Sequence, residues 1–355
     1  MIFIFGTFPP PVHGMSNVNE KLYGQLTVDG FEVQKVNTSP KTLNRNFVNL
    51  LSRLIPFLRG WLLISFRLTK IDTLYLTPSA GFGQIYDVIT ILIAKLKGTR
   101  KLFIHHHSIK YLEQPNFINH IFFSLTKNTS IHIALCKEMA KKLQATHQCQ
   151  HIFVLSNFSV LFRHNSCKKE KSKKQNNNFK IGYLSNITKE KGGWLIIDLA
   201  KNIQKKHLAV KVIIAGPCHD PDLESELKTS QQQGLLTWLG PVYEEEKLRF
   251  FDSIDIFVFP TQNEAEPLVI WEAISHQIPV ISYNRGCIGN QVQNAGHVFT
   301  PEQNFTNQTV QILETWINDP LIFQDFVQKV AIQHANMQEK ANHQWEGLVT
   351  ALRYE

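Results

Sequence analysis

The sequence has little that would suit a secreted, disulfide-stabilised or membrane-spanning protein. It contains five cysteines in 355 residues, and no two of them form a Cys-x-x-Cys pair. An odd, scattered set of cysteines is typical of reduced thiols in a cytoplasm and argues against a disulfide framework or a zinc site. No apolar run is both long enough and free enough of charge to span a bilayer. The opening run, Ile2-Phe3-Ile4-Phe5-Gly6, lacks a basic segment and a cleavage site, so it predicts a strand and not a signal peptide.

Acidic residues are scarce in the first half of the chain. Residues 1–165 contain 18 Lys or Arg but only 7 Asp or Glu, a net charge of +11, whereas residues 179–355 carry a net charge of −7. A basic half joined to an acidic half indicates that the first half meets an anionic partner, such as nucleic acid or an acidic lipid surface. No recognisable RNA- or DNA-binding motif accompanies the basic residues, so we expect no nucleic-acid partner. A nucleic-acid-binding protein nevertheless remains as an alternative, because the sequence pI is about 9.1.

One basic segment is also strongly apolar. Residues 46–69 predict a helix, rich in aromatic side chains and broken or kinked at Pro56. On a wheel of 100° per residue, Arg59, Arg67 and Lys70 fall in one narrow sector. This pattern suits a helix that lies on an anionic membrane surface. It suits a core helix with one solvated basic face equally well, and both interpretations stay open.

Strand and helix patterns alternate along the whole chain, which predicts an α/β protein. The length is sufficient for two domains, each with its own core. Residues 166–178, SCKKEKSKKQNNN, are charged, repetitive and poor in apolar side chains, as in a solvated linker. We therefore expect a first Rossmann-like domain at residues 1–165 and a second one that begins at residue 179.

The most informative stretch is FVFPTQNEAEPLVIWEAISHQIPVISYN, residues 257–284. It reads as a buried strand ending at Pro260, a polar loop, a helix over residues 267–276 and another strand, which together form one βαβ unit. Ligands of such sheets bind at the corner between loop and helix. Glu264 and Glu272 frame that corner. The backbone N–H groups near the helix start, at Glu266, Leu268 and Val269, would favour a phosphate there.

The run NEAEPLVIWEA followed by PVIS resembles the donor-site signature of retaining GT-B glycosyltransferases of family 4. The resemblance implies that Glu264 contacts the donor sugar and Glu272 the ribose of the nucleotide. The commoner family form has Gly-Phe-Gly where this chain has Ala265-Glu266-Pro267. In the loop after the second domain's first strand, the family usually has an arginine followed five residues later by a lysine. Here Asn186 stands at the arginine position and Lys191 is kept, which implies that Lys191 neutralises the donor diphosphate.

Two residues of the first half are also assigned through the resemblance. The Pro- and Gly-rich loop that contains Gly14 would approach the donor phosphates. His107, the last of three consecutive histidines after a predicted strand at residues 101–104, would approach the donor sugar. Alternation along the strand places His105 and His107 on one side and His106 on the other. A metal site would need a third ligand that the sequence does not identify, and a purely structural role of the histidines stays open.

The resemblance further implies a GT-B fold, with two Rossmann-like domains facing a cleft. The second domain would comprise residues 179–340, and a C-terminal helix at residues 341–355 would pack back on the N-terminal domain. The implied reaction moves a sugar from a UDP- or GDP-sugar to a lipid-linked or other glycan acceptor of cell-surface polysaccharide, such as lipopolysaccharide or capsule. It would need no metal or other cofactor and would take place at the cytoplasmic face of the membrane.

Asn186 and the pair Asp220 and Asp222 also bear on this interpretation. Because Asn186 replaces the usual arginine, the chain could instead be a catalytically inactive relative that acts as a partner in a polysaccharide assembly complex. This is a second alternative. Asp220 and Asp222 imitate the Asp-x-Asp metal motif of another glycosyltransferase fold, but they precede a predicted helix, so we expect them to cap it.

Overall fold

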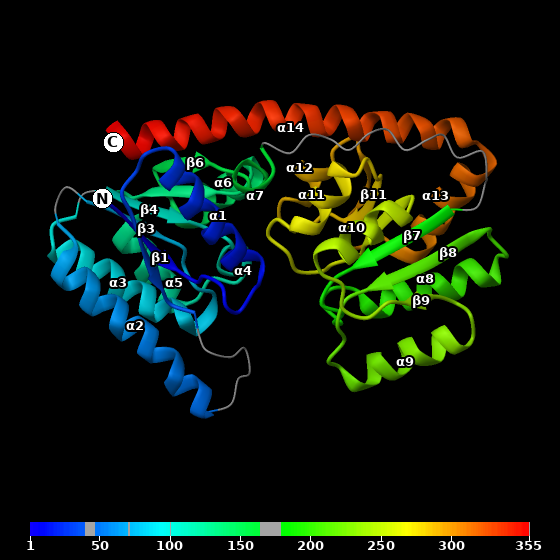
Figure 1. Cartoon of the computed structure of the whole chain (residues 1–355), viewed down its shortest axis with the longest axis horizontal. Helices are drawn as coiled ribbons and strands as arrows, with labels where there is room; N and C mark the ends of the chain where they lie inside the picture. The colour runs from blue at the N-terminus through cyan, green and yellow to red at the C-terminus, as the bar shows by residue number, and fades with distance from the viewer. Residues whose placement is uncertain (40–46, 70–71, 100, 164–178, 355) are drawn as a thin grey trace. The chain divides into compact units, whose positions relative to one another are not determined.

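The computed structural model describes residues 1–39, 47–69, 72–99, 101–163 and 179–354, and side chains from residue 54 onward in the first long helix. The chain forms two compact units, one of Met1–Arg163 with Gln338–Glu355 and the other of His164–Met337. Both are shown in Figure 1. The predicted linker, residues 166–178, and Lys70 lie outside the described residues.

The first unit is built on a six-stranded parallel sheet in the order β2-β1-β3-β4-β5-β6. Strands β1 and β3 are buried at every residue, as expected for parallel strands covered by helices on both faces. The order reverses between β1 and β3, which makes that point the topological switch of the sheet. The strands are β1 (Ile2–Gly6), β2 (Val33–Asn37), β3 (Thr73–Leu76), β4 (Lys101–His105), β5 (Ile131–Ala134) and β6 (His151–Val154). The helices are α1 (Gly14–Val28), α2 (Phe47–Arg67), η1 (Gly81–Gly83), α3 (Gln84–Leu96), α4 (Lys110–Glu113), α5 (Phe117–Thr126), α6 (Lys137–His147) and α7 (Asn157–Leu161).

The second unit repeats this plan with the order β12-β11-β10-β7-β8-β9. Its strands are again parallel, and the switch lies between β7 and β10. The strands are β7 (Phe179–Leu184), β8 (Val210–Ala215), β9 (Thr237–Trp238), β10 (Ile256–Phe259), β11 (Val280–Tyr283) and β12 (Gly296–Phe299). The helices are α8 (Gly193–Lys205), α9 (Pro221–Gln232), α10 (Glu244–Ser253), α11 (Leu268–Ser275), α12 (Ile288–Val292) and α13 (Phe305–Asn318). Two parallel, doubly wound sheets confirm the predicted fold class.

The last helix, α14 (Pro320–Tyr354), is a single helix whose final part belongs to the first unit. The Gln344 side-chain oxygen accepts hydrogen bonds from Ser156 N at 3.0 Å and Ser159 Oγ at 2.6 Å. The Trp345 indole N–H donates to Asp29 Oδ2 at 2.7 Å. The expected packing of residues 341–355 on the N-terminal domain is therefore confirmed.

The helix was expected to be broken or kinked at Pro56; a break is wrong, because α2 runs through this residue. The loss of one backbone N–H is offset by close packing on the sheet. Phe57 and Ile64 are buried, and a Cβ built on Gly60 would lie 2.9 Å from Phe5. The helix of the βαβ unit, α11, starts one residue later than predicted, with Pro267 as its N-cap.

The cysteines are only partly as expected. Cys149 and Cys218 are free and buried. Cys136 and Cys287 are disulfide-bonded, so the expectation of reduced thiols is wrong for these two.

Across the described residues, none of the helices combines the length and the apolar character that crossing a bilayer requires.

Candidate functional site

Lys191 and Glu264 meet at the switch point of the second sheet. Lys191 lies in the loop after β7 and Glu264 in the loop after β10, and these two strands are neighbours. The Lys191 ammonium forms an ion pair with Glu264 Oε1 and donates to the Asn263 carbonyl oxygen at 3.2 Å. Tyr183, at the end of β7, donates its hydroxyl hydrogen to the Lys191 carbonyl oxygen at 3.1 Å. The fold thus brings together two predicted residues that are 73 positions apart in the sequence.

Two glycines allow the neighbouring loops to lie in direct contact. Gly192 has a φ of +84°, and a Cβ on it would lie 2.5 Å from the Pro260 carbonyl oxygen. Gly286, which follows β11, has a φ of +54°, and a Cβ there would lie 2.3 Å from the Glu264 carbonyl oxygen. A side chain at either position would force these loops apart. The backbone around Glu264 is therefore fixed from both sides.

Glu272 lies on α11 and has one occupied and one open oxygen. Its Oε1 accepts from the Lys247 ammonium at 2.6 Å. Its Oε2 is buried and has no hydrogen-bond partner within the described part of the chain. A buried carboxylate oxygen without a partner is unfavourable, so it is a ready acceptor for a ligand hydroxyl. Lys247 was missed at the sequence level, because nothing in the charged helix Glu244–Ser253 indicated that α10 would face α11.

The other residues of the second unit that were predicted to bind the sugar donor lie around the same carboxyl edge of the sheet. Leu268 and Val269 open α11 and are partly exposed, whereas Glu266 is buried and its Oε1 accepts from the Trp271 indole N–H at 3.1 Å. The Glu266 side chain therefore supports α11. Asn186 is exposed in the loop after β7, and its carbonyl oxygen accepts from Ser185 Oγ at 3.0 Å.

Gly14 and His107 belong to the first unit. Gly14 is the first residue of α1, and a Cβ on it would meet nothing within 4 Å. The preceding His13 is the N-cap, and its Nδ1 accepts from Ser16 N at 3.3 Å. Burial, followed by the nearby His13, lowers the pKa of His107 to about 3, so His107 is neutral at physiological pH. Its Nε2 is buried and lacks a hydrogen-bond partner among the described residues.

The other histidines are held by partners inside the unit. His105 packs on His107, with ring centroids 4.1 Å apart, and its Nδ1 lies 2.9 Å from the Tyr75 hydroxyl. His106 faces away from them and contacts His132 Nδ1 at 2.9 Å and the Tyr111 hydroxyl at 2.8 Å. The predicted alternation is confirmed, and His106 is hydrogen-bonded through both ring nitrogens.

The described residues contain no group of three or more His, Cys, Asp or Glu side chains placed to hold a metal ion. Asp220, of the Asp-x-Asp sequence, is the N-cap of α9. Its Oδ1 accepts from Asp222 N at 3.1 Å and from Leu223 N at 3.2 Å. The prediction that these aspartates cap a helix is confirmed for Asp220, whereas Asp222 lies in the first turn of α9 and supplies one of the capped N–H groups.

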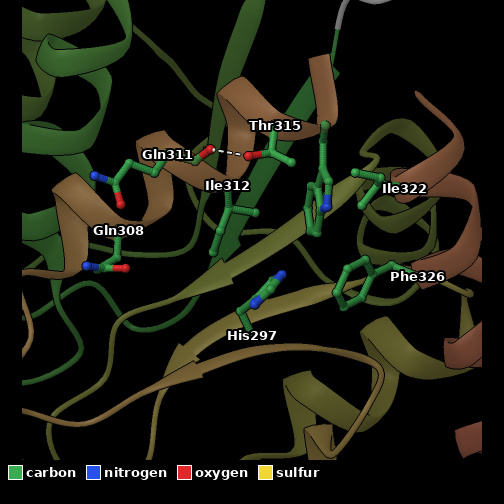
Figure 2. Close-up of a pocket in the computed structure, with 8 residues that line it drawn as sticks. His297, Gln308, Gln311, Ile312, Thr315, Ile322 and Phe326 are labelled. Carbon is green, nitrogen blue, oxygen red and sulfur yellow. Dashed lines mark hydrogen bonds between the residues drawn. The ribbon is translucent and has the colours of Figure 1, made fainter. Parts of the chain in front are cut away.

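A pocket of about 190 Å³ lies elsewhere in the second unit, between β12, α13 and the start of α14. Figure 2 shows His297 beside Phe326, and Gln308 and Thr315 on α13. The ring centroids of His297 and Phe326 are 4.7 Å apart. Its one titratable side chain is His297, whose pKa is lowered by burial. A lining without a charged group is poorly suited to a diphosphate, and none of the predicted site residues lines it.

Comparison with known proteins supports the interpretation of the second unit. Residues 165–341 match the family of glycosyl transferases group 1. The capsular polysaccharide biosynthesis glycosyltransferase CapM of Staphylococcus aureus is 29% identical over 160 residues. That match spans 44% of this chain and 41% of CapM, so less than half of that relative is covered.

Two solved structures share the fold over almost the full chain. The Anabaena Alr3699/HepE structure in complex with UDP superposes with a TM-score of 0.69 at 16% identity, covering 99% of this chain and 100% of that one. The sucrose-phosphate synthase of Thermosynechococcus elongatus superposes with a TM-score of 0.73 at 12% identity, covering 99% and 98%. At these identities the similarity shows the fold alone.

Proposed function

Because residues 165–341 make this chain a member of the glycosyl transferases group 1, we propose that it is a retaining glycosyltransferase. In our proposal it moves a hexosyl or N-acetylhexosaminyl group from a nucleoside diphosphate sugar to an acceptor of cell-surface polysaccharide. CapM is named for capsular polysaccharide biosynthesis, and HepE was solved with UDP, which supports a polysaccharide product and UDP as the first nucleotide to test.

The observation that carries the proposal is the pairing of Lys191 with Glu264 at the carboxyl edge of β7 and β10. Anionic ligands of doubly wound sheets bind at such a switch point, near helix starts. The diphosphate would replace Glu264 as the partner of Lys191, and the Lys191 ammonium would stabilise the negative charge that develops as the sugar departs.

The two glutamates would then divide the donor between them. Glu264, released from Lys191, would orient the sugar, and the open Oε2 of Glu272 would accept a hydrogen bond from a ribose hydroxyl. His107 would contribute a neutral imidazole near the sugar, and Gly14 would allow the α1 start to approach the phosphates. The acceptor would attack from the same face as the departing diphosphate, whose phosphate would take the acceptor proton.

Donor binding and turnover test this proposal and separate it from the inactive alternative. UDP or GDP at 100 times its dissociation constant should stabilise the protein by about 2.7 kcal/mol, visible as a shift in melting temperature. Release of nucleoside diphosphate from a nucleotide sugar should accompany transfer. Stabilisation without any turnover, across sugars and acceptors, would favour the inactive partner.

The acceptor in our proposal is a lipid-linked glycan, used at the cytoplasmic face of the membrane. Lys191 and the helix start supply the positive charge that a metal would otherwise provide, so turnover should survive EDTA. Loss of turnover in EDTA that Mg²⁺ or Mn²⁺ restores would contradict metal independence.

A further inference from the structure

We propose that the outward faces of α2 and α3 form a docking surface for an anionic lipid bilayer, into which their exposed apolar side chains insert. This deepens the proposed function, because a lipid-linked acceptor lies at such a surface. The inference rests on the proposed function only to explain why the protein would bind a membrane. Binding to a bilayer can be measured without any transfer reaction.

Helix α2 is apolar on two opposite faces. One face is buried on the sheet through Phe57 and Ile64. The opposite face carries four large apolar side chains that are between 45% and 84% exposed, namely Ile55, Leu58, Leu62 and Phe66. A globular protein's surface helix normally presents polar residues on its outer face, and a helix that is apolar all round needs a second apolar environment.

Helix α3 extends this apolar surface. The Trp61 indole N–H donates to Thr90 Oγ1 at 2.9 Å, and the Phe57 and Tyr86 ring centroids are 4.6 Å apart. These contacts place the two helices side by side in the same direction, as Figure 1 shows. The turn η1 and α3 expose four more large apolar residues: Phe82, Ile85, Leu92 and Leu96. Eight such side chains on α2, η1 and α3 exceed the scattered apolar residues of an ordinary surface.

The charges on these elements all favour an anionic partner. Residues 54–112 contain two acidic residues, Asp72 and Asp87, and both are buried. Arg59 and Arg67 are exposed. At 100° per residue, Arg59 lies beside the exposed apolar residues and Arg67 lies on the flank of α2. Each basic residue near an anionic surface contributes roughly 1 kcal/mol, and a long arginine side chain can reach head groups while its stem stays in apolar surroundings.

This combination suits a bilayer better than a second copy of the chain. A two-fold dimer through this face would bring the arginines of both copies together, with no exposed carboxylate on α2 or α3, among the described residues, to neutralise them. An anionic bilayer supplies both missing components, acyl chains for the apolar residues and acidic head groups for the arginines. The face therefore matches the chemistry of a lipid surface.

Vesicle flotation of the full-length protein tests the proposal. The wild type should bind vesicles of phosphatidylglycerol and phosphatidylcholine, and bind vesicles of phosphatidylcholine alone at least about tenfold more weakly. Leu62→Glu, which places an acid in the centre of the face, should weaken binding to the anionic vesicles at least about tenfold. The matched control is Ile332→Glu on α14, because Ile332 is 59% exposed and Leu62 is 60% exposed.

Nucleoside diphosphate binding in lipid-free buffer, measured by calorimetry, keeps this test separate from the proposed function. Both variants should keep the wild-type affinity, which also shows that they are folded. Equal flotation of Leu62→Glu and wild type would overturn the proposal, as would equal binding to neutral and anionic vesicles. A concentration-dependent dimer that Leu62→Glu dissociates, without flotation of the wild type, would assign the face to self-association and would also overturn it.

Discussion

Glu264 and Glu272 lie eight residues apart but have different partners, and this difference separates their expected roles. Glu264 pairs with the loop lysine Lys191, and Glu272 pairs with Lys247 on α10. Glu272→Ala should weaken binding of the free nucleoside diphosphate and of the complete donor alike. Losing a hydrogen bond to a charged group costs about 1.5–3 kcal/mol, one to two decades in affinity.

Glu264→Gln should behave differently. The substitution removes the carboxylate that occupies Lys191, so nucleoside diphosphate affinity should stay the same or increase slightly, while turnover falls severely because the sugar loses its near-attack geometry. Calorimetry with the nucleoside diphosphate, beside a turnover assay, distinguishes the two. Glu314→Ala is the control, because Glu314 is paired with Lys206 at 2.8 Å on the surface of α13. Equal loss of diphosphate affinity in both site variants would show that the division of roles is wrong.

At the residue scale, the sequence identified the acidic pair but not what surrounds it. Glu264 and Glu272 could be located because the strand, loop and helix predicted around them resemble the donor-site signature of the family. The spacing of the two glutamates alone is a weak signal. Lys247 could not, because a lysine in an acidic helix has no local signal for a partner 25 residues away. For the same reason, only the fold showed that Glu266 turns inward to Trp271.

The final turns of α14 act as a structural part of the first unit. The Trp345 indole donates to Asp29, and its ring packs under the Arg163 guanidinium, 4.2 Å from the ring centroid. Trp345→Ala should destabilise the first unit by about 3–5 kcal/mol, because it leaves a cavity and removes the donor from Asp29. Trp345→Phe should cost less, since it keeps most of the ring.

Hydrogen exchange resolved by peptide measures this effect, because a chain of two units does not unfold in one step. Protection should fall in the strands of the first unit and remain in the second. Trp194→Ala provides a control, because Trp194 is 40% exposed on α8. If the first unit of Trp345→Ala kept the protection of the wild type, the final turns of α14 would not stabilise that unit, and the prediction would be wrong.

At the element scale, the sequence predicted strand and helix order well, because parallel strands are continuous apolar runs and the helices are periodic. It failed where tertiary packing decided the outcome. Pro56 is accommodated because α2 packs closely on β1 and β2 at Gly60. The sequence did not show that α2 is apolar on two opposite faces, because a high aromatic content also fits a core helix. The exposed apolar face could be recognised only once the buried face was known.

At the scale of the molecule, lowering the pH should destabilise the first unit before the second. Burial lowers the pKa of His107 to about 3 and that of His132 to about 4, and holds the pKa of His105 and His106 well below the usual range. In the unfolded chain these groups bind protons near pH 6.5, so the unfolded state takes up more protons as pH falls. Each adds a slope of up to about 1.4 kcal/mol per pH unit, so stability is lost from pH 6.5 down to about 4 for His132 and about 3 for His107.

Asp87 opposes this trend. Its pKa is raised to about 8 by burial, so the native state binds the extra proton, and its contribution to stability falls as pH rises towards 8. The stability that Asp87 gains as the pH falls offsets the loss from about one histidine. Because four histidines are buried, the net effect of lowering the pH is still to destabilise the first unit. Hydrogen exchange at pH 7 and pH 5, corrected for intrinsic exchange rates, should show protection lost mainly in β3 to β5. Equal loss in both units would contradict a dominant role for these histidines.

The central claim is that a nucleoside diphosphate binds beside Lys191 at the switch point of the second sheet. The most direct measurement is calorimetric titration of UDP and GDP into wild type, Lys191→Ala and Lys201→Ala. Lys201 is a matched control, because it is ion-paired with Glu226 at 2.7 Å on the same unit but away from the loop. We predict that one nucleotide binds wild type and Lys201→Ala equally and binds Lys191→Ala ten- to a hundredfold more weakly. Failure of both nucleotides to bind wild type, or equal affinity in all three proteins, would contradict the account.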